Sequence, residues 1–241
     1  MLKKPQFIFI DIDNTLLDFD KCSMASARLA AASQGLTLPD NIWQIFKPIN
    51  DDFWQRLERG EITIDQLHQQ RWNVVLQAAG LSGDGLLFEH DFRTALKDQH
   101  IEVEGARDLL VYLSARYPLA AASNGPSAQQ IKRLSDADLA PYFSYVFVSE
   151  DMGANKPSAA FFDACFETVN ADRQKRGQKA LAPEDTLMIG DSITADIRGA
   201  RSYGMATLWY DHDKAAGPGR MEADEYVRDL GQIQKILQFN K

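Results

Sequence analysis

The chain has 241 residues, of which 45% are hydrophobic and 25% are charged, close to the globular average. At about 100 to 200 residues per domain, this length predicts one large domain or two unequal ones, with a core that needs no disulfides. Lys and Arg number 26 against 34 Asp and Glu, and the net charge of −8 argues against binding a nucleic acid polymer or an anionic membrane. An anionic ligand must therefore be held by local cations.

The apolar runs are short, and the run at residues 7–10 is far below the 18 or more residues of a membrane span. This run ends at Asp11, so the N-terminal segment also lacks the pattern of a signal peptide. The two cysteines, Cys22 and Cys165, are in no metal-ligand spacing, which is typical of compartments where thiols stay reduced. We therefore expect a cytoplasmic protein with no membrane partner. Its oligomeric state is left open.

The segment at residues 6–10 is apolar up to two aspartates, which is typical of a strand buried on both faces of a parallel sheet. Similar segments follow later and alternate with helical ones, so the sequence predicts a doubly wound α/β sheet. A last strand and an amphipathic helix are expected within residues 222–239. The other expected strands are Leu119–Ser123, Tyr145–Ser149, Thr186–Gly190 and Met205–Tyr210, and the expected helices are Gly105–Arg116, Ser127–Ala137, Ala159–Asn170 and Thr194–Tyr203.

One stretch breaks this alternation. Four consecutive helices, at residues 23–33, 41–58, 63–79 and 86–97, are expected after the first strand. They exceed what one crossover between parallel strands needs, so we predict a small helical domain at 18–97, inserted into an α/β domain of residues 1–17 and 98–241. The alternative is that these helices pack on the sheet. A polar, basic stretch at 171–183 is interpreted as a surface loop, with a partner-binding patch as the alternative.

Polar side chains follow the expected strands at the positions where ligands bind in open α/β sheets, beyond the carboxyl ends. The first strand runs into Asp11 and Asp13, the second ends at Ser123, Lys156 follows the third, and Asp191 follows the fourth. Three converging carboxylates need a divalent cation, and Mg²⁺ favours oxygen ligands together with phosphate. The pattern therefore predicts a metal and phosphate site, although each aspartate alone is also typical of a turn or a helix cap.

Each of these groups has a predicted role. Asp11 can attack phosphorus and form an aspartyl-phosphate, and Asp13 can donate a proton to the leaving oxygen and later accept one from water. Lys156 can offset phosphate charge and orient the nucleophile, and Ser123 can hydrogen-bond a phosphoryl oxygen. Asp196 is placed to hold the metal shell or Lys156. The backbone amides expected to complete the phosphate cradle are those of Ile12, Asp13 and Asn124.

These residues resemble the four motifs of the haloacid dehalogenase (HAD) superfamily, over nearly the whole chain. The matching motifs are Asp11-Ile-Asp13-Asn-Thr-Leu16, Ser123 in Ala-Ala-Ser-Asn-Gly, Lys156 in Asn-Lys-Pro, and Gly190-Asp191-Ser192 with Asp196 after it. The resemblance implies a Rossmann-like core and Mg²⁺ held by Asp11, the backbone carbonyl of Asp13, and Asp191. It also implies that the helical insert is a type C1 cap, which closes on the core and helps to choose the substrate.

The resemblance further implies a phosphatase, because family dehalogenases keep no acid at the position of Asp13. Family phosphonatases use a cap lysine, for which Lys47 is the one candidate between Cys22 and Arg93. A haloacid dehalogenase remains a less favoured alternative. A phosphate- or nucleotide-binding regulator that has kept the fold without the chemistry is another.

Residues 13–20 and 58–63, with Trp54 between them, look similar to bacterial pyrimidine nucleoside 5′-monophosphatases and to N-acylneuraminate-9-phosphatases. This implies a small phosphorylated metabolite as partner, with a nucleotide as the first choice and a sugar phosphate or phosphoglycolate as alternatives. In the insert, Asn50, Trp54 and Arg71 are candidates to face the leaving group, and Trp54 could stack on a base. The alternative is that the tryptophans of the insert pack its helices together.

Overall fold

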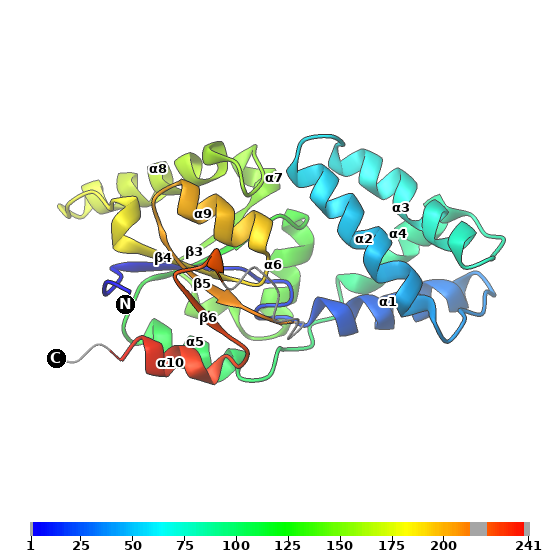
Figure 1. Cartoon of the computed structure of the whole chain (residues 1–241). Helices are drawn as coiled ribbons and strands as arrows, with labels where there is room; N and C mark the ends of the chain where they lie inside the picture. Colours follow the sequence, from blue (N-terminus) through cyan, green and yellow to red (C-terminus); the bar gives the residue numbers. More distant parts are fainter. Residues whose placement is uncertain (1, 213–220, 239–241) are drawn as a thin grey trace. The chain divides into compact units, whose positions relative to one another are not determined.

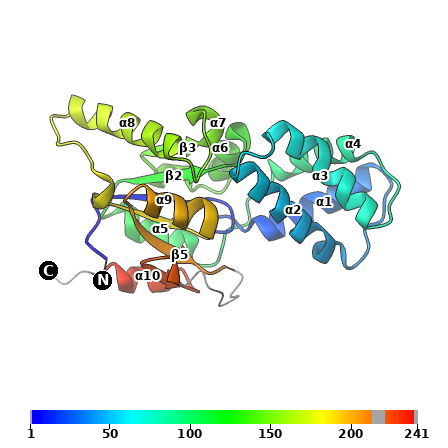
Figure 2. The ribbon, with the colours of Figure 1, turned by 45° about the horizontal axis from the view of Figure 1, so that its top comes forward.

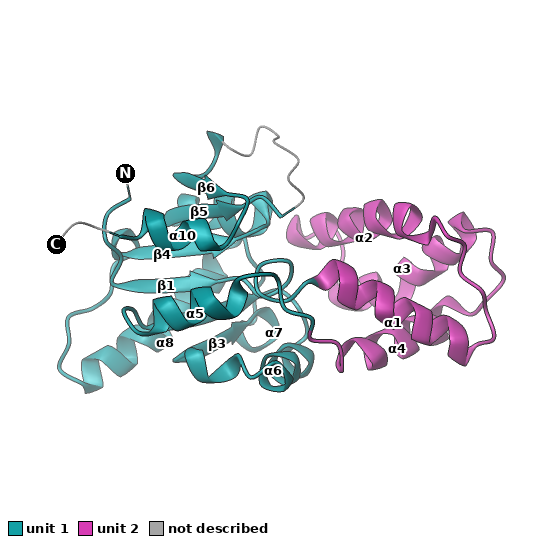
Figure 3. Cartoon of the chain, turned by 90° about the horizontal axis from the view of Figure 1, so that it is seen from below, with its two compact units in different colours: residues 1–18, 101–241 teal, residues 19–100 magenta. Residues whose placement is uncertain are grey.

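The chain divides into two compact units, which Figure 3 shows in separate colours. Unit 1 comprises residues 1–18 and 101–241, and unit 2 comprises residues 19–100. The computed structural model describes residues 2–212 and 221–238. No helix in this described part is both long enough and apolar enough to cross a membrane.

Unit 1 is built around a sheet of parallel strands in the order β3-β2-β1-β4-β5-β6. In β1, Ile10 is in register with Ala121 of β2 on one side and Ile189 of β4 on the other. This order confirms the predicted doubly wound, Rossmann-like architecture, and it places the topological switch point between β1 and β4, where such sheets bind ligands. The strands are β1 (Phe7–Ile10), β2 (Leu119–Ser123), β3 (Tyr145–Val148), β4 (Thr186–Gly190), β5 (Ala206–Tyr210) and β6 (Glu225–Val227).

Helices cover both faces of this sheet. They are α5 (Ala106–Ser114), α6 (Ser127–Asp136), α7 (Ser149–Met152), α8 (Ala159–Lys175), α9 (Gly199–Ser202) and α10 (Gly231–Ile236). Side chains alternate along β1, so that Ile8 and Ile10 join a core with α5 and α10, whereas Phe7 and Phe9 join a core with α8 and α9. Figures 1 and 2 show these pairs of helices on opposite faces. The apolar run of β1 is therefore buried on both sides.

Two helical segments differ from the sequence prediction. The surface loop predicted at 171–183 begins only after Lys175, because the polar residues before it are good helix formers and Gly177, with φ at 67°, ends the helix region. The segment predicted as one helix over 194–203 begins as a π-helix, Ile193–Arg198, and continues as α9. In the predicted C-terminal segment, β6 and α10 are present, and Phe239 lies outside the described residues.

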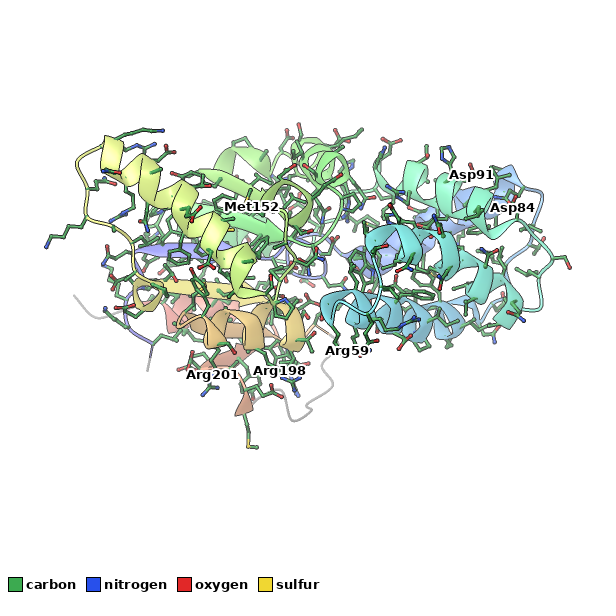
Figure 4. The ribbon with its side chains drawn as sticks, turned by 90° about the horizontal axis from the view of Figure 1, so that it is seen from above. Arg59, Asp84, Asp91, Met152, Arg198 and Arg201 are labelled. Carbon is green, nitrogen blue, oxygen red and sulfur yellow. The ribbon has the colours of Figure 1, made fainter. Side chains whose placement is uncertain are left out.

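Unit 2 consists of helices that enclose their own aromatic core. Trp72 is fully buried, and its ring centroid lies 4.2 Å from that of Phe88 and 5.1 Å from those of Phe46 and Phe92. The last helix is capped by Asp84, labelled in Figure 4, whose carboxylate accepts from two backbone amides of the first turn. The helices are α1 (Phe19–Ser33), α2 (Ile42–Glu58), α3 (Ile64–Ala78) and α4 (Gly85–Leu96).

A buried ion pair joins three of the helices of unit 2. The guanidinium of Arg71 donates to both oxygens of Glu89, at 2.7 and 3.2 Å, and to Asn50 Oδ1 at 2.8 Å. The two charged side chains are only 3% and 4% exposed. Burial raises the pKa of Glu89, and the charge of Arg71 opposes this shift. Removal of either partner would therefore leave the other as a buried charge without a counter-ion.

We predict that Arg71→Met lowers the free energy of unfolding by about 3 to 5 kcal/mol, because it leaves Glu89 buried and uncompensated. The double variant Arg71→Met/Glu89→Met should lose less, because no buried charge remains. Urea unfolding of the full chain measures both. The control is Arg59→Met, at a residue labelled in Figure 4, which breaks the exposed Arg59–Glu61 pair and should cost less than about 1 kcal/mol. Equal losses in the single and double variants would contradict the prediction.

Candidate active site

The predicted site residues of unit 1 meet where β1, β2 and β4 end. The backbone amide of Asp11 still pairs with the carbonyl oxygen of Ile189 in β4, at 2.9 Å, so the sheet itself fixes the position of Asp11. Beyond Asp11 the chain turns, and the carbonyl of Ile12 accepts from the backbone amides of Leu16 and Leu17. Asn14 occupies the left-handed region in this turn, with φ at 58°, which asparagine tolerates well.

Lys156 lies at the centre of the site and is 1% exposed. Its ammonium group donates to Asp11 Oδ1 at 2.7 Å, to Asp196 Oδ1 at 2.7 Å and to the carbonyl oxygen of Ala122 at 2.6 Å. An ammonium has three N–H groups, and each of them has an acceptor here. Burial opposes the charge on Lys156, but the two aspartates outweigh it and raise the pKa of the lysine.

Asn124 holds Lys156 in place through its side chain. The amide oxygen of Asn124 accepts from the backbone amide of Lys156, and the amide nitrogen donates to the backbone carbonyl of Lys156, both at 2.8 Å. The sequence predicts a backbone contact between Asn124 and phosphate, and it does not reveal this clamp. The two functions are compatible, because the clamp uses only side-chain atoms of Asn124.

The π-helix after β4 places Asp196 in contact with Lys156. Besides the contact with Lys156, Asp196 Oδ2 accepts from the backbone amide of Ser192 at 3.0 Å. A Cβ atom on Gly190 would lie 2.2 Å from this oxygen, so the glycine leaves the space that the carboxylate occupies. Trp209 of β5 donates from Nε1 to the carbonyl oxygen of Asp191 at 2.7 Å, a contact that the sequence analysis missed.

Asp11, Asp191 and Asp196 form a cluster of carboxylates whose oxygens lie within 4.8 Å of one another. Burial raises the pKa of Asp11 to about 7, against the opposing charge of Lys156. Burial and the neighbouring carboxylates also raise the pKa of Asp191. Lys156 contacts two of these three carboxylates, Asp11 and Asp196, and the all-oxygen donor set fits a hard divalent cation such as Mg²⁺. Because both oxygens of Asp196 are already bonded, Asp11 and Asp191 are the side chains best placed to hold an ion.

Asp13 lies on a different set of contacts, which connects it to α6. Its Oδ1 accepts from Arg133 Nη1 and its Oδ2 accepts from Gln130 Nε2, both at 2.5 Å. Gln130 Nε2 also donates to Ser123 Oγ at 2.6 Å, which joins the two predicted phosphate-site residues. Gln130 and Arg133 are not among the site residues predicted from the sequence. Their spacing of three residues on the helix that follows Ser123 is the one signal that could have found them.

The residues predicted to choose the substrate all lie in unit 2. Asn50 and Arg71 are brought together in the buried cluster with Glu89, and Arg71 already uses three of its nitrogens there. Trp54 lies one helical turn after Asn50 on α2, half-buried against a small apolar cluster that contains Phe53 and Leu57. Their contact with a substrate stays a prediction.

The Rossmann-like sheet carries its acidic site at the switch point, where such sheets bind ligands. A sequence model of the haloacid dehalogenase-like hydrolase family matches residues 6–204. The chain belongs to this family, as the four motifs predicted.

Curated relatives cover most of the chain. It is 33% identical over 98% of its length to the HAD-hydrolase YfnB of Bacillus subtilis, covering 97% of that protein. It is 34% identical over 86% of its length to the pyrimidine 5′-nucleotidase PynA of Streptococcus pneumoniae, covering 84% of that protein. The pyrimidine 5′-nucleotidase YjjG of Escherichia coli is 27% identical over 97% of this chain and 98% of its own length. The chain is a phosphatase of the HAD family.

A solved structure has the same fold. The crystal structure of YfnB bound to magnesium superposes with a TM-score of 0.87 at 33% identity, over 98% of this chain and all of the other. In YfnB, that crystal form reveals interdomain movement.

We predict that Asp11→Asn abolishes phosphate release while the fold is retained, because an amide is a poor nucleophile but can still accept a hydrogen bond from Lys156. Phosphate release and the thermal unfolding midpoint are measured together. The matched control is Asp40→Asn, an exposed loop position in unit 2, which should keep wild-type turnover. Turnover by the Asp11→Asn protein at the wild-type rate would exclude Asp11 as the nucleophile.

Proposed function

We propose that the protein is a Mg²⁺-dependent nucleoside 5′-monophosphatase that prefers pyrimidine nucleotides. The observation that carries this proposal is the 34% identity with PynA, together with a site in which Asp11, Asp13, Lys156 and Asp191 all meet at the ends of the strands. The likeness to YjjG, a second pyrimidine 5′-nucleotidase, supports the same substrate class. Glyceraldehyde 3-phosphate phosphatases of Pyrococcus, at 24% identity, keep a small sugar phosphate as the second candidate.

In the first half of the proposed reaction, a carboxylate oxygen of Asp11 attacks phosphorus and the bond to the nucleoside oxygen breaks. Asp13 gives its proton to that oxygen, so the nucleoside leaves as a neutral alcohol. Lys156 holds Asp11 in place and Ser123 donates its hydroxyl hydrogen to a phosphoryl oxygen. The backbone amides of Ile12, Asp13 and Asn124 complete the phosphate site in this proposal.

In the second half, water attacks the phosphorus of the aspartyl-phosphate. Asp13, now a carboxylate, accepts the proton of this water, and the bond between phosphorus and Asp11 breaks. Inorganic phosphate leaves and Asp11 is restored. A dehalogenase expels a halide, which needs no proton to leave, so the carboxyl group of Asp13 supports the phosphatase over the dehalogenase.

The cation site proposed for Mg²⁺ consists of Asp11, Asp191 and the backbone carbonyl of Asp13. A bound Mg²⁺ would neutralise charge on the phosphoryl group as the new bond forms. Asp196 would act through Lys156, whose ammonium it contacts at 2.7 Å. We propose that unit 2 is the cap that helps to choose the substrate, and that the enzyme acts in the cytoplasm on small phosphorylated metabolites.

The first test is phosphate release from UMP, dUMP, dTMP, AMP, N-acetylneuraminate 9-phosphate, phosphoglycolate, glyceraldehyde 3-phosphate and several sugar phosphates. We expect the highest kcat/KM with the pyrimidine nucleotides, and loss of activity with EDTA that added Mg²⁺ restores. A preference for another substrate would withdraw the nucleotide assignment and leave the phosphatase. Halide release from 2-haloacids without metal, in place of phosphate release, would favour the dehalogenase.

The second test asks whether Trp54 contacts the base. Trp54→Leu should raise KM for UMP about tenfold with little change in kcat, because stacking on a base contributes about 1 to 3 kcal/mol. KM for a substrate without a base, such as phosphoglycolate, should not change. The matched control is Trp43→Leu, a second half-buried tryptophan of the same helix, which packs on Phe46. Equal effects of the two substitutions on UMP would show that Trp54 only packs the helices.

A further inference from the structure

Arg133 is a buried cation that none of the four motifs explains. It lies on α6 and is 0% exposed. Its Nη1 donates to Asp13 Oδ1 at 2.5 Å and to Gln130 Oε1 at 2.9 Å. Taking a guanidinium out of water costs several kcal/mol, and only a well-matched anion offsets this cost. An apolar side chain would fill a buried helix position without that cost. The charge of Arg133 is therefore directed at Asp13.

Gln130 connects the contacts around Asp13. Its side-chain oxygen accepts from Arg133, which fixes which end of the amide faces the site. The nitrogen then donates to both Asp13 Oδ2 and Ser123 Oγ, so the carboxyl group and the hydroxyl are held by the same atom. Gln130 is itself fully buried.

Gly125 makes room for this arrangement. A Cβ atom at this position would lie 2.6 Å from Gln130 Nε2, in the loop that follows Ser123. The backbone amide of Gly125 also donates to Ser123 Oγ at 3.1 Å. The loop and the helix thus converge on one hydroxyl and one carboxyl group.

We propose that Arg133 and Gln130 are positioning residues, which hold the carboxyl group of Asp13 in register with the hydroxyl of Ser123 during phosphoryl transfer. The inference rests on the acid and base roles of Asp13 in the proposed function, but not on the identity of the nucleotide. The contacts leave Asp13 able to donate a proton. A carboxyl oxygen that carries the proton keeps a lone pair that accepts from Gln130 while its hydrogen is donated to the leaving oxygen.

The test compares leaving groups. An alkoxide needs a proton to leave, whereas 2,4-dinitrophenolate leaves without one, so loss of a well-placed acid slows only the first. The readout is kcat/KM, because it covers the steps up to departure of the leaving group. It is measured for two substrates. One is 2,4-dinitrophenyl phosphate, and the other is the alkyl phosphomonoester that the wild type hydrolyses fastest. Asp13→Asn provides the reference pattern.

We expect Arg133→Met and Gln130→Met to lower kcat/KM on the alkyl substrate by about 10²-fold and on the dinitrophenyl substrate by less than about threefold. Arg133→Lys should recover part of the loss, because it keeps the charge but cannot reach both Asp13 and Gln130. Retained turnover of the dinitrophenyl substrate shows that each variant is folded. The matched control is Gln129→Met, the neighbouring buried glutamine of α6, which should change neither value.

Equal losses of Arg133→Met and Gln130→Met on both substrates would overturn the inference, and so would no loss on either. If Asp13→Asn itself slows both substrates equally, the acid role in the proposed function fails, and the inference fails with it. A wild type that prefers a sugar phosphate to UMP would overturn only the nucleotide assignment, because the alkyl substrate is chosen by rate.

Discussion

The site depends on the hydrogen bonds and ion pairs of one group, the ammonium of Lys156. It is almost completely buried, and it remains charged because two carboxylates and one carbonyl surround it. Its acceptors come from the loop after β1, from β2, and from the π-helix after β4. One cation thereby fixes the relative positions of three segments that are far apart in the sequence. Loss of this charge would leave Asp11 and Asp196 buried and repelling each other, at a cost of several kcal/mol.

The same ammonium also explains the unusual local structure around it. A regular α-helix after β4 was expected, but the structure has a π-helix there, with Ile197 bonded to Ser192 five residues back. Such turns are rare and concentrate at functional sites. Here the turn carries the residue that contacts Lys156, and Gly190 has no side chain to block it. The π-helix and the glycine together place the carboxylate of Asp196 against Lys156.

The sequence allowed the sheet and the motif residues to be predicted, for a physical reason. Strands buried on both faces are continuous apolar runs, and in a parallel sheet their carboxyl ends meet at one edge, so Asp11, Ser123 and Asp191 could be brought together without coordinates. Gln130 and Arg133 could not be found in this way. They lie inside an amphipathic helix, where a glutamine or an arginine ordinarily faces water. Only the structure shows that this face of α6 is turned toward Asp13.

The pairing of charges gives the site two distinct sides. Asp11 and Asp13 are two residues apart, and each contacts its own buried cation, Lys156 in one case and Arg133 in the other. Adjacent residues of β2 serve the two sides, because the carbonyl of Ala122 binds the lysine and the hydroxyl of Ser123 binds Gln130. Without cations the carboxylates of Asp11 and Asp13 would repel each other, whereas one shared cation would draw them together. Separate cations hold each carboxylate in its own place, as the roles that we propose for them, a nucleophile and an acid on the same substrate, require.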